Sequence, residues 1–281
     1  MPHSFQVFAP AKVNLFLHVT GKRADGYHTL QSLMVFADAG DALSFGEHEG
    51  FIVETAGPFA DDLPKTEDNL IDKAARLLAA EYAVPLRGKI VLTKNLPVAS
   101  GLGGGSADAA AALRGLARLW DLPEEASRLR ALGLRLGADL PACIGSRAVF
   151  ADGIGEVLTA MKDMPALHLV LVNPRVSVPT AEVFKKRQGA FSEPLPVPEK
   201  ITADFLGECR NDLTQAAIAV APEIGDVLRA VGTTNGCLFA RMSGSGATCF
   251  GFYEDAGAAG QAANVLTAAH PAWWIRAAKV I

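Results

Sequence analysis

The sequence predicts an α+β protein divided into two domains. Apolar residues alternate as in strands through roughly the first 55 residues, and helical spacing first appears after Asn69. Further along, strands and helices follow one another without the regular βα alternation of a doubly wound sheet. A chain of 281 residues, half of them hydrophobic, is long enough for about two domains. We place the boundary at residue 160, which gives domains 1–160 and 161–281.

Composition and charge exclude several classes of protein. The net charge is −4, with 26 basic and 30 acidic residues, which argues against a nucleic-acid partner. The four cysteines lie far apart, a spacing typical of reduced thiols in the cytosol. We find neither a signal peptide nor the ~20-residue apolar run that crosses a membrane. The sequence therefore predicts a cytoplasmic protein without a membrane partner. We expect a monomer or a weak homodimer, although none of these observations determines the oligomeric state.

The first third of the chain is predicted to be rich in strands. Apolar residues alternate on both sides of Pro10, which predicts strands broken at this residue. A polar turn is expected at residues 21–28, and further strands at residues 30–36, 43–45 and 51–55. From Asn69 to Tyr82 the apolar spacing becomes helical.

The remaining elements follow from the same patterns. A strand at residues 89–94 leads into a glycine-rich stretch and its helix, and Gly137 ends a helix at residues 124–136. Strands are expected at residues 147–150, 157–159, 167–172, 237–242, 247–253 and 273–280. Helices are expected near residues 179 and 203 and at residues 211–220, 223–231 and 256–268. Three prolines mark residues 188–200 as an irregular connection.

The most informative segment is the glycine-rich stretch at residues 97–110, PVASGLGGGSADAA. Glycine permits positive φ and lets backbone N–H groups approach an anion without a Cβ in the way. Ser106 leads directly into alanines, the strongest helix formers, and apolar residues continue at helical spacing as far as Trp120. A helix N-terminus has unpaired N–H groups and the positive end of the dipole. The stretch therefore predicts a phosphate-binding loop.

A linker and the common nucleotide-binding motifs fit this stretch less well. A flexible Gly-Ser linker rarely continues into an amphipathic helix. A Walker motif requires a lysine after the glycines, and this sequence has none there. The dinucleotide-binding fingerprint ends in a glycine, and this sequence has Ser106 at that position. The sequence also lacks the HRD and DFG elements of protein kinases. The loop therefore indicates a different design of nucleotide-binding protein.

Five motifs follow one another in a fixed order along the chain. PAKVNLFL at residues 10–17, the glycine-rich stretch and MSGSGATCFG at residues 242–251 resemble the GHMP superfamily of galactokinase, homoserine kinase, mevalonate kinase and phosphomevalonate kinase. Within it, GKRADGYHTL at residues 21–30 and GADLP at residues 137–141 are similar to the family of 4-diphosphocytidyl-2-C-methyl-D-erythritol kinases. The resemblance covers most of the chain and is weakest at residues 188–235.

The resemblance implies a two-domain GHMP kinase fold. Its N-terminal domain would be similar to the second domain of ribosomal protein S5, its C-terminal domain would be ferredoxin-like, and the active site would lie between them. The implied reaction is ATP-dependent phosphorylation of the 2-hydroxyl of 4-diphosphocytidyl-2-C-methyl-D-erythritol, in the non-mevalonate isoprenoid pathway. ATP would be the co-substrate, and Mg²⁺ would bridge its phosphates. The sequence identifies no protein ligand for the metal.

Lys12 and Asp139 are the predicted catalytic residues. A hydroxyl attacks phosphorus poorly unless a positioned carboxylate, here Asp139, accepts its proton. Lys12 lies among apolar residues, where its ammonium could pair with Asp139 or stabilise charge on the transferred phosphoryl group. The residues alone leave structural alternatives open, namely a capping or loop aspartate and a lysine that protects an edge strand. The resemblance favours the catalytic roles.

The resemblance also implies two binding sites. The predicted ATP-binding residues are Asn69, Lys94, Pro97, Val98, Ala99, Ser100, Gly101, Leu102, Gly103, Gly104, Gly105, Ser106 and Ala107. The predicted substrate-binding residues are Asn14, Tyr27, His28, Thr180, Phe184, Gly244, Ser245 and Gly246. A flat cytosine stacks well on the aromatic members of the second set. Structural alternatives remain open here too: a core phenylalanine at 184, helix caps at 69 and 180, and a tight turn at 244–246.

One departure from the family follows Ser106. Members often have a pair of serines after the glycines, whereas in this sequence Ala107 and Asp108 follow Ser106. Asp108 suits the dipole at a helix N-terminus, but a carboxylate close to ATP phosphates would repel them unless magnesium lies between. This departure bears on which residues after Ser106 contact the phosphates of ATP. It does not bear on the assignment to the family.

Two other functions compete with this one. Another enzyme of the superfamily would phosphorylate mevalonate, homoserine or a sugar, and it would have no use for Tyr27 and His28. A nucleotide-binding regulator would bind ATP without turnover. The presence of both Lys12 and Asp139 argues against the regulator.

Overall fold

The computed structural model of the protein describes residues 4–63, 69–162 and 164–281. They form two compact units, neither of which is continuous in the sequence. Unit 1 contains the described residues up to Ala11, Gly40–Val98 and Gly103–Ser146, and unit 2 contains Lys12–Ala39, Ala99–Leu102 and Arg147–Ile281. The predicted boundary at residue 160 gives each domain one continuous stretch, and it stays a prediction.

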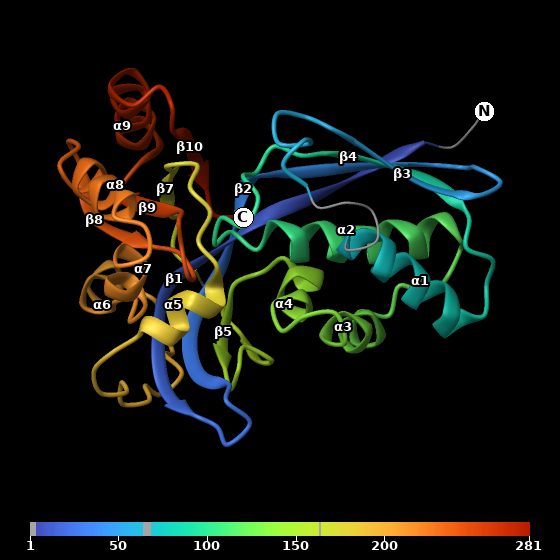
Figure 1. The fold of residues 1–281 in the computed structure, drawn as a ribbon, viewed down its shortest axis with the longest axis horizontal. Coiled ribbons are helices and arrows are strands. Elements are labelled where there is room, and N and C mark those ends of the chain that lie inside the picture. Colours follow the sequence, from blue (N-terminus) through green and yellow to red (C-terminus); the bar gives the residue numbers. More distant parts are fainter. Residues whose placement is uncertain (1–3, 64–68, 163) are drawn as a thin grey trace. The chain divides into compact units, whose positions relative to one another are not determined.

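The strands β1 (Phe5–Lys22) and β2 (His28–Gly46) are long (Figure 1). Each of them contributes residues to both units. The predicted break at Pro10 is wrong, because β1 continues through this residue. The fixed φ of proline is compatible with an extended strand, and burial of residues 9–19 holds this strand in one piece. The separate strands predicted at residues 30–36 and 43–45 are likewise one strand, β2.

The described residues of unit 1 form strands and four helices. Strand β3 (Phe51–Ala56) runs parallel to β4 (Gly88–Thr93), and β4 pairs antiparallel with the second half of β2. The helices are α1 (Leu70–Tyr82), α2 (Gly104–Leu119), α3 (Ala126–Leu134) and α4 (Leu140–Gly145). The first three agree with the sequence-based predictions. The short helix α4 is an addition, since the GADLP motif predicted no element.

Two local contacts explain how α1 begins and how α2 packs. Asn69 caps α1, because its Oδ1 accepts a hydrogen bond of 2.9 Å from the backbone N–H of Ile71. Gly115 lies in the middle of α2, where any Cβ would collide with the ring of Phe45 on β2. The glycine therefore allows α2 to pack closely on the sheet.

Unit 2 contains a ferredoxin-like sheet. Its strands β7 (His168–Asn173), β8 (Cys237–Met242), β9 (Cys249–Tyr253) and β10 (Trp274–Lys279) are antiparallel, in the order β10-β7-β9-β8. Helices α8 (Glu223–Gly232) and α9 (Ala256–Ala269) pack against this sheet (Figure 1). The connections give the split βαβ pattern. The ferredoxin-like prediction is thereby confirmed.

The remaining elements of unit 2 are short. Strands β5 (Val149–Asp152) and β6 (Val157–Ala160) extend the first half of β2, with Ser32 opposite Ala151. The other helices are α5 (Thr180–Lys186), α6 (Ala203–Glu208) and α7 (Thr214–Ile218). Residues 188–200 contain neither helix nor strand, as their prolines predicted. Across the described residues, no helix combines the length and the apolar character needed to span a lipid bilayer.

Candidate active site

The glycine-rich loop has the backbone of an anion-binding loop. Gly101 and Gly103 have φ of +78° and +61°, in the left-handed region that glycine tolerates best. Gly103 is the N-cap of α2 and provides no side-chain cap. The first turn of α2 contains no acidic residue. The N–H groups of this turn therefore face no negative side chain of their own helix, which suits a phosphate.

A buried charged cluster lies behind the loop in unit 1. Lys94 Nζ is 2.6 Å from Asp41 Oδ2 and 2.6 Å from Asp108 Oδ2. All three side chains are at most 4% exposed. The carboxylate of Asp108, whose proximity to the phosphates of ATP was the concern raised by the sequence, is paired with Lys94 inside the unit. Lys94 is predicted to bind ATP, but its ammonium points to these two carboxylates.

Asp41 connects this cluster to the backbone before the loop. Its Oδ1 accepts hydrogen bonds from the N–H groups of Asn95 and Leu96, at 2.6 and 2.9 Å. The cluster thus holds both the segment that leads into the loop and the helix that follows it. No motif indicates this role, since Asp41 is one polar residue in a long strand, 53 positions before Lys94.

Burial has a large effect on Asp108. Burial raises the pKa of this carboxyl to about 7, and the negative charge of Asp41 adds to the increase. The positive charge of Lys94 acts in the opposite direction and lowers the pKa, but it does not outweigh the effect of burial. Burial also disfavours the charged form of Lys94, but the two carboxylates outweigh it and the pKa of Lys94 is raised. The lysine is therefore a permanent cation in this cluster.

The first motif forms a hydrogen-bonded chain in unit 2. Lys12 Nζ donates to Asn14 Oδ1 at 2.8 Å, and Asn14 Nδ2 donates to Ser32 Oγ at 2.7 Å. Ser32 in turn donates to the carbonyl of Phe16 at 2.6 Å. Lys12 and Asn14 are 4% and 1% exposed. Asn14 therefore fixes the ammonium of Lys12, which the sequence alone did not predict.

The third motif joins the first motif to the glycine loop. Ser243 Oγ accepts from the N–H of Asn14 at 3.1 Å and donates to the carbonyl of Gly101 at 2.9 Å. A Cβ on Gly101 would lie 2.5 Å from the carbonyl oxygen of Ser243. Lys12 N–H also donates to the carbonyl of Leu102 at 2.8 Å. Parts of three motifs that are far apart in the sequence thus meet within unit 2.

Asn211 holds the third motif through hydrogen bonds to its backbone. Its Nδ2 donates to the carbonyls of Met242 and Gly244, each at 2.8 Å. Thr180, at the start of α5, lies beside the same motif, with its hydroxyl 2.8 Å from that of Ser245. The predicted substrate residues Thr180, Gly244 and Ser245 are therefore neighbours. Asn211 was missed because the resemblance is weakest in its part of the sequence.

The predicted aromatic platform is also in unit 2. The rings of His28 and Phe184 are stacked, with centroids 5.1 Å apart and an interplanar angle of 23°. Tyr27 is 62% exposed. Partial burial, together with the positive charges of Lys22 and Arg187, lowers the pKa of His28. The neutral imidazole can both donate and accept a hydrogen bond.

Asp139, the predicted catalytic base, belongs to unit 1, whereas Lys12 belongs to unit 2. Asp139 is the N-cap of α4 in unit 1, and its side chain makes no capping hydrogen bond with that helix. Capping therefore does not account for this aspartate. Its pairing with Lys12 of unit 2 stays a prediction.

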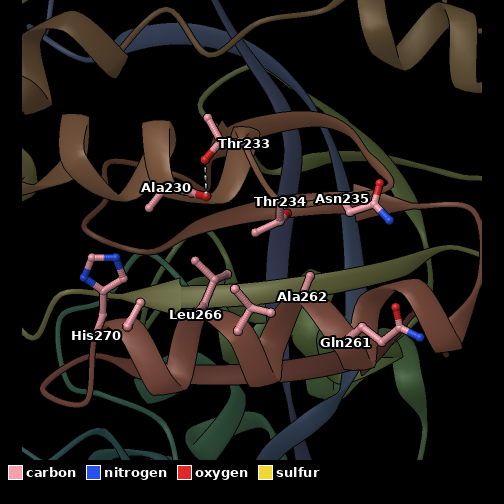
Figure 2. Close-up of a pocket in the computed structure, with 10 residues that line it drawn as sticks. Ala230, Thr233, Thr234, Asn235, Gln261, Ala262, Leu266 and His270 are labelled. Carbon is pink, nitrogen blue, oxygen red and sulfur yellow. Dashed lines mark hydrogen bonds between the residues drawn. The ribbon is translucent and has the colours of Figure 1, made fainter.

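A hollow on unit 2 is separate from these residues. It lies between α8 and α9, has a volume of roughly 440 Å³, and contains Leu266 and His270 in its lining (Figure 2). None of the predicted site residues lines it. Among the described residues, no three His, Cys, Asp or Glu side chains are grouped so that they could hold a metal ion.

Comparison with known proteins defines the class. Residues 69–147 match the family model of the GHMP kinases N terminal domain, and residues 202–272 match that of the GHMP kinases C terminal domain. Both matches agree with the fold and with the glycine loop. The fold and the loop are thus those of a GHMP kinase.

Relatives at high identity define the family within this class. A 4-diphosphocytidyl-2-C-methyl-D-erythritol kinase from Paramagnetospirillum magneticum is 52% identical, over 99% of both chains. One from Cereibacter sphaeroides is 49% identical, over 98% of this chain and 99% of its own. A crystal structure of 4-(cytidine 5'-diphospho)-2C-methyl-D-erythritol kinase superposes with a TM-score of 0.83 at 32% identity, covering 98% of this chain and 99% of the other. The chain belongs to the family of 4-diphosphocytidyl-2-C-methyl-D-erythritol kinases.

More distant structures share the fold alone. Homoserine kinase from Cytophaga hutchinsonii superposes with a TM-score of 0.71 at 18% identity, over 99% of this chain and 97% of its own. The predicted family and the two-domain GHMP kinase fold are confirmed by these comparisons.

Proposed function

We propose that the chain transfers the γ-phosphoryl group of ATP to the 2-hydroxyl of 4-diphosphocytidyl-2-C-methyl-D-erythritol, a step of the non-mevalonate isoprenoid pathway. The observation that carries this proposal is the meeting of the three GHMP motifs, in which Ser243 links Asn14 to Gly101. The family to which the chain belongs supports the choice of substrate. The protein would act in the cytoplasm, as a monomer or a weak homodimer.

ATP would bind through the glycine loop. The N–H groups at the start of α2 would hold its phosphates, since this helix has no side-chain cap. Asn69 and Lys94 would lie near the adenosine, with the ammonium of Lys94 held by Asp41 and Asp108. Mg²⁺ would accompany ATP and neutralise charge on its phosphates.

The catalytic residues would act on the acceptor hydroxyl. Asp139 would accept the hydroxyl proton while the oxygen forms its bond to the γ-phosphorus, and the bond from this phosphorus to the bridging oxygen breaks to release ADP. Lys12 would stabilise the charge that develops on the transferred group. Its hydrogen bond to Asn14 would keep the ammonium oriented.

The substrate would be recognised at both ends. Tyr27, His28 and Phe184 would contact the cytosine, and Thr180 would bind a phosphate or hydroxyl oxygen. The backbone of Gly244–Gly246 would approach the substrate phosphates, because glycine has no Cβ to prevent it. This recognition distinguishes the proposed enzyme from kinases of mevalonate or homoserine, because those acceptor substrates contain no nucleobase.

An ATP-consumption assay tests the proposal. The purified protein is incubated with Mg²⁺, ATP and either the cytidine-diphosphate alcohol, mevalonate or homoserine. Turnover with the cytidine compound alone is the expected result. Turnover with mevalonate or homoserine instead, or ATP binding without any turnover, would contradict it.

A further inference from the structure

We propose that Phe191 is a specificity-determining residue, which forms an additional wall of the nucleobase site, and that Arg187 positions it. The inference rests on the proposed function, because it concerns the binding of the cytidine part of that substrate. Phe191 lies in the irregular connection between α5 and α6. All residues involved belong to unit 2.

The stacking of His28 on Phe184 leaves the base without a slot between these two rings. Their centroids are 5.1 Å apart, whereas a base held between two rings needs about 7 Å, twice the van der Waals contact distance. A base must therefore use another face of this aromatic group. Phe191 supplies a ring in addition to those of Tyr27, His28 and Phe184, and its centroid is 6.4 Å from that of His28 at an interplanar angle of 58°.

The exposure of Phe191 favours a ligand contact. Its side chain is 46% exposed, although its ring lies close to that of His28. A large apolar ring in this position leaves surface in water that a stacked base would cover. The neutral imidazole of His28 lies alongside and could satisfy the polar edge of a pyrimidine.

Arg187 holds the ring in place. Its guanidinium lies 4.9 Å above the centroid of Phe191, a cation–π geometry. Its Nη1 donates to the carbonyl of Gly189 at 3.1 Å, and its Nη2 donates to that of Ala190 at 2.5 Å. These bonds close the short turn that precedes Phe191, in which Gly189 has a φ of +92°.

The segment is also tied down on the far side of Phe191. The N–H of Ser192 donates to the carbonyl of Val19 at 2.9 Å, and the Ser192 hydroxyl donates to Asp212 Oδ2 at 2.5 Å. Gln31 and Leu195 exchange two hydrogen bonds, at 2.7 and 3.1 Å. The strand β1 thus fixes the backbone next to Phe191. A connection that merely spanned two helices would not need such anchors.

Substitution of Phe191 tests the proposal through the two Michaelis constants. Phe191→Ala should raise KM for the cytidine-diphosphate substrate roughly 5- to 150-fold, the range expected for loss of one stacked base, and leave KM for ATP within about twofold. Arg187→Met should raise the same KM by a smaller factor. Phe8→Ala is the matched control, because Phe8 is 42% exposed and belongs to unit 1; it should change neither constant.

Three outcomes distinguish a base contact from a structural role. An unchanged KM for the cytidine substrate in an active, folded Phe191→Ala would overturn the inference while leaving the proposed function intact. An inactive wild-type protein would overturn the proposed function itself. If Phe191→Ala lowers Tm and weakens ATP binding, Phe191→Leu decides, because it keeps apolar bulk without a π-system: a raised KM supports base stacking, and a wild-type KM contradicts it.

Discussion

Lys94 and Asp108 form an ion pair of 2.6 Å that is almost completely buried under the glycine loop. Lys94 directly follows strand β4 and precedes the segment that enters the loop, and Asp108 lies one turn into the helix that leaves it. The pair, together with Asp41, therefore ties the two ends of the loop to each other.

Removal of the lysine should be strongly destabilising. Lys94→Met leaves two buried carboxylates without their cation, and we expect a loss of about 3–5 kcal/mol in the free energy of unfolding, measured by urea denaturation. Lys89→Met is a matched control on the neighbouring strand β4, because its pair with Glu54 is largely exposed. The control should lose less than about 1 kcal/mol. Equal losses in the two variants would contradict the buried cluster.

The raised pKa of Asp108 predicts a specific dependence of stability on pH. The folded protein retains this proton to a pKa of about 7, whereas the unfolded chain releases it near the ordinary value of 3.8. Between these values the folded state binds more protons, so this group makes stability fall as pH rises. Asp108→Asn removes the titration. Between pH 5 and pH 8 the free energy of unfolding of the variant should rise by more than about 1 kcal/mol relative to that of the wild type, measured by chemical denaturation. If the two free energies change with pH in parallel, Asp108 is charged over the whole range and the prediction is wrong.

Ser243 should affect both stability and activity. Its hydroxyl is buried and bonds to Asn14 and Gly101, so Ser243→Ala leaves buried polar groups unpaired and should cost about 1–3 kcal/mol. We also expect kcat/KM to fall, since the loop and the first motif lose one of the hydrogen-bonded links between them. Thr267→Ala on α9, whose hydroxyl bonds to a carbonyl of its own helix, should stay within about 0.5 kcal/mol of wild type with unchanged activity. A wild-type kcat/KM in Ser243→Ala would mean that the link has no catalytic importance.

Asp139→Asn tests the assignment of the catalytic base. The amide cannot accept the hydroxyl proton, so kcat should fall by about 10²–10⁴ while KM for ATP stays nearly constant. Steady-state kinetics with both substrates varied measure the two effects. Turnover near the wild-type rate would remove Asp139 from the mechanism.

Much of the architecture could be predicted from the sequence, since apolar spacing and the glycine-rich stretch depend on local residues. The errors have tertiary causes. Gly40 lies between the two strands predicted in place of β2, and it stays within the strand because β1 approaches so closely that a Cβ would collide with Ala9. Pro10 lies within β1 for a tertiary reason as well. Burial of the residues around it keeps the strand continuous, although proline is commonly found where a strand ends.

The candidate site was predictable where motifs provide it and unpredictable where distant residues support it. The motifs identified Lys12, Asn14 and the loop, all of which have close polar partners in the structure. Asp41 and Asn211 could not be found, because a single polar residue gains its role only when the chain brings its partners together. The unexpected burial of Asp108 has the same origin, since its partner Lys94 lies outside its own helix.

A crystal structure with a non-hydrolysable ATP analogue, Mg²⁺ and the cytidine-diphosphate substrate tests the central claim most directly. We predict that the β- and γ-phosphates accept hydrogen bonds of about 3 Å from N–H groups of Gly103–Ser106, and that a carboxylate oxygen of Asp139 contacts the acceptor hydroxyl. A triphosphate bound away from this loop, or Asp139 turned away from that hydroxyl, would contradict the account.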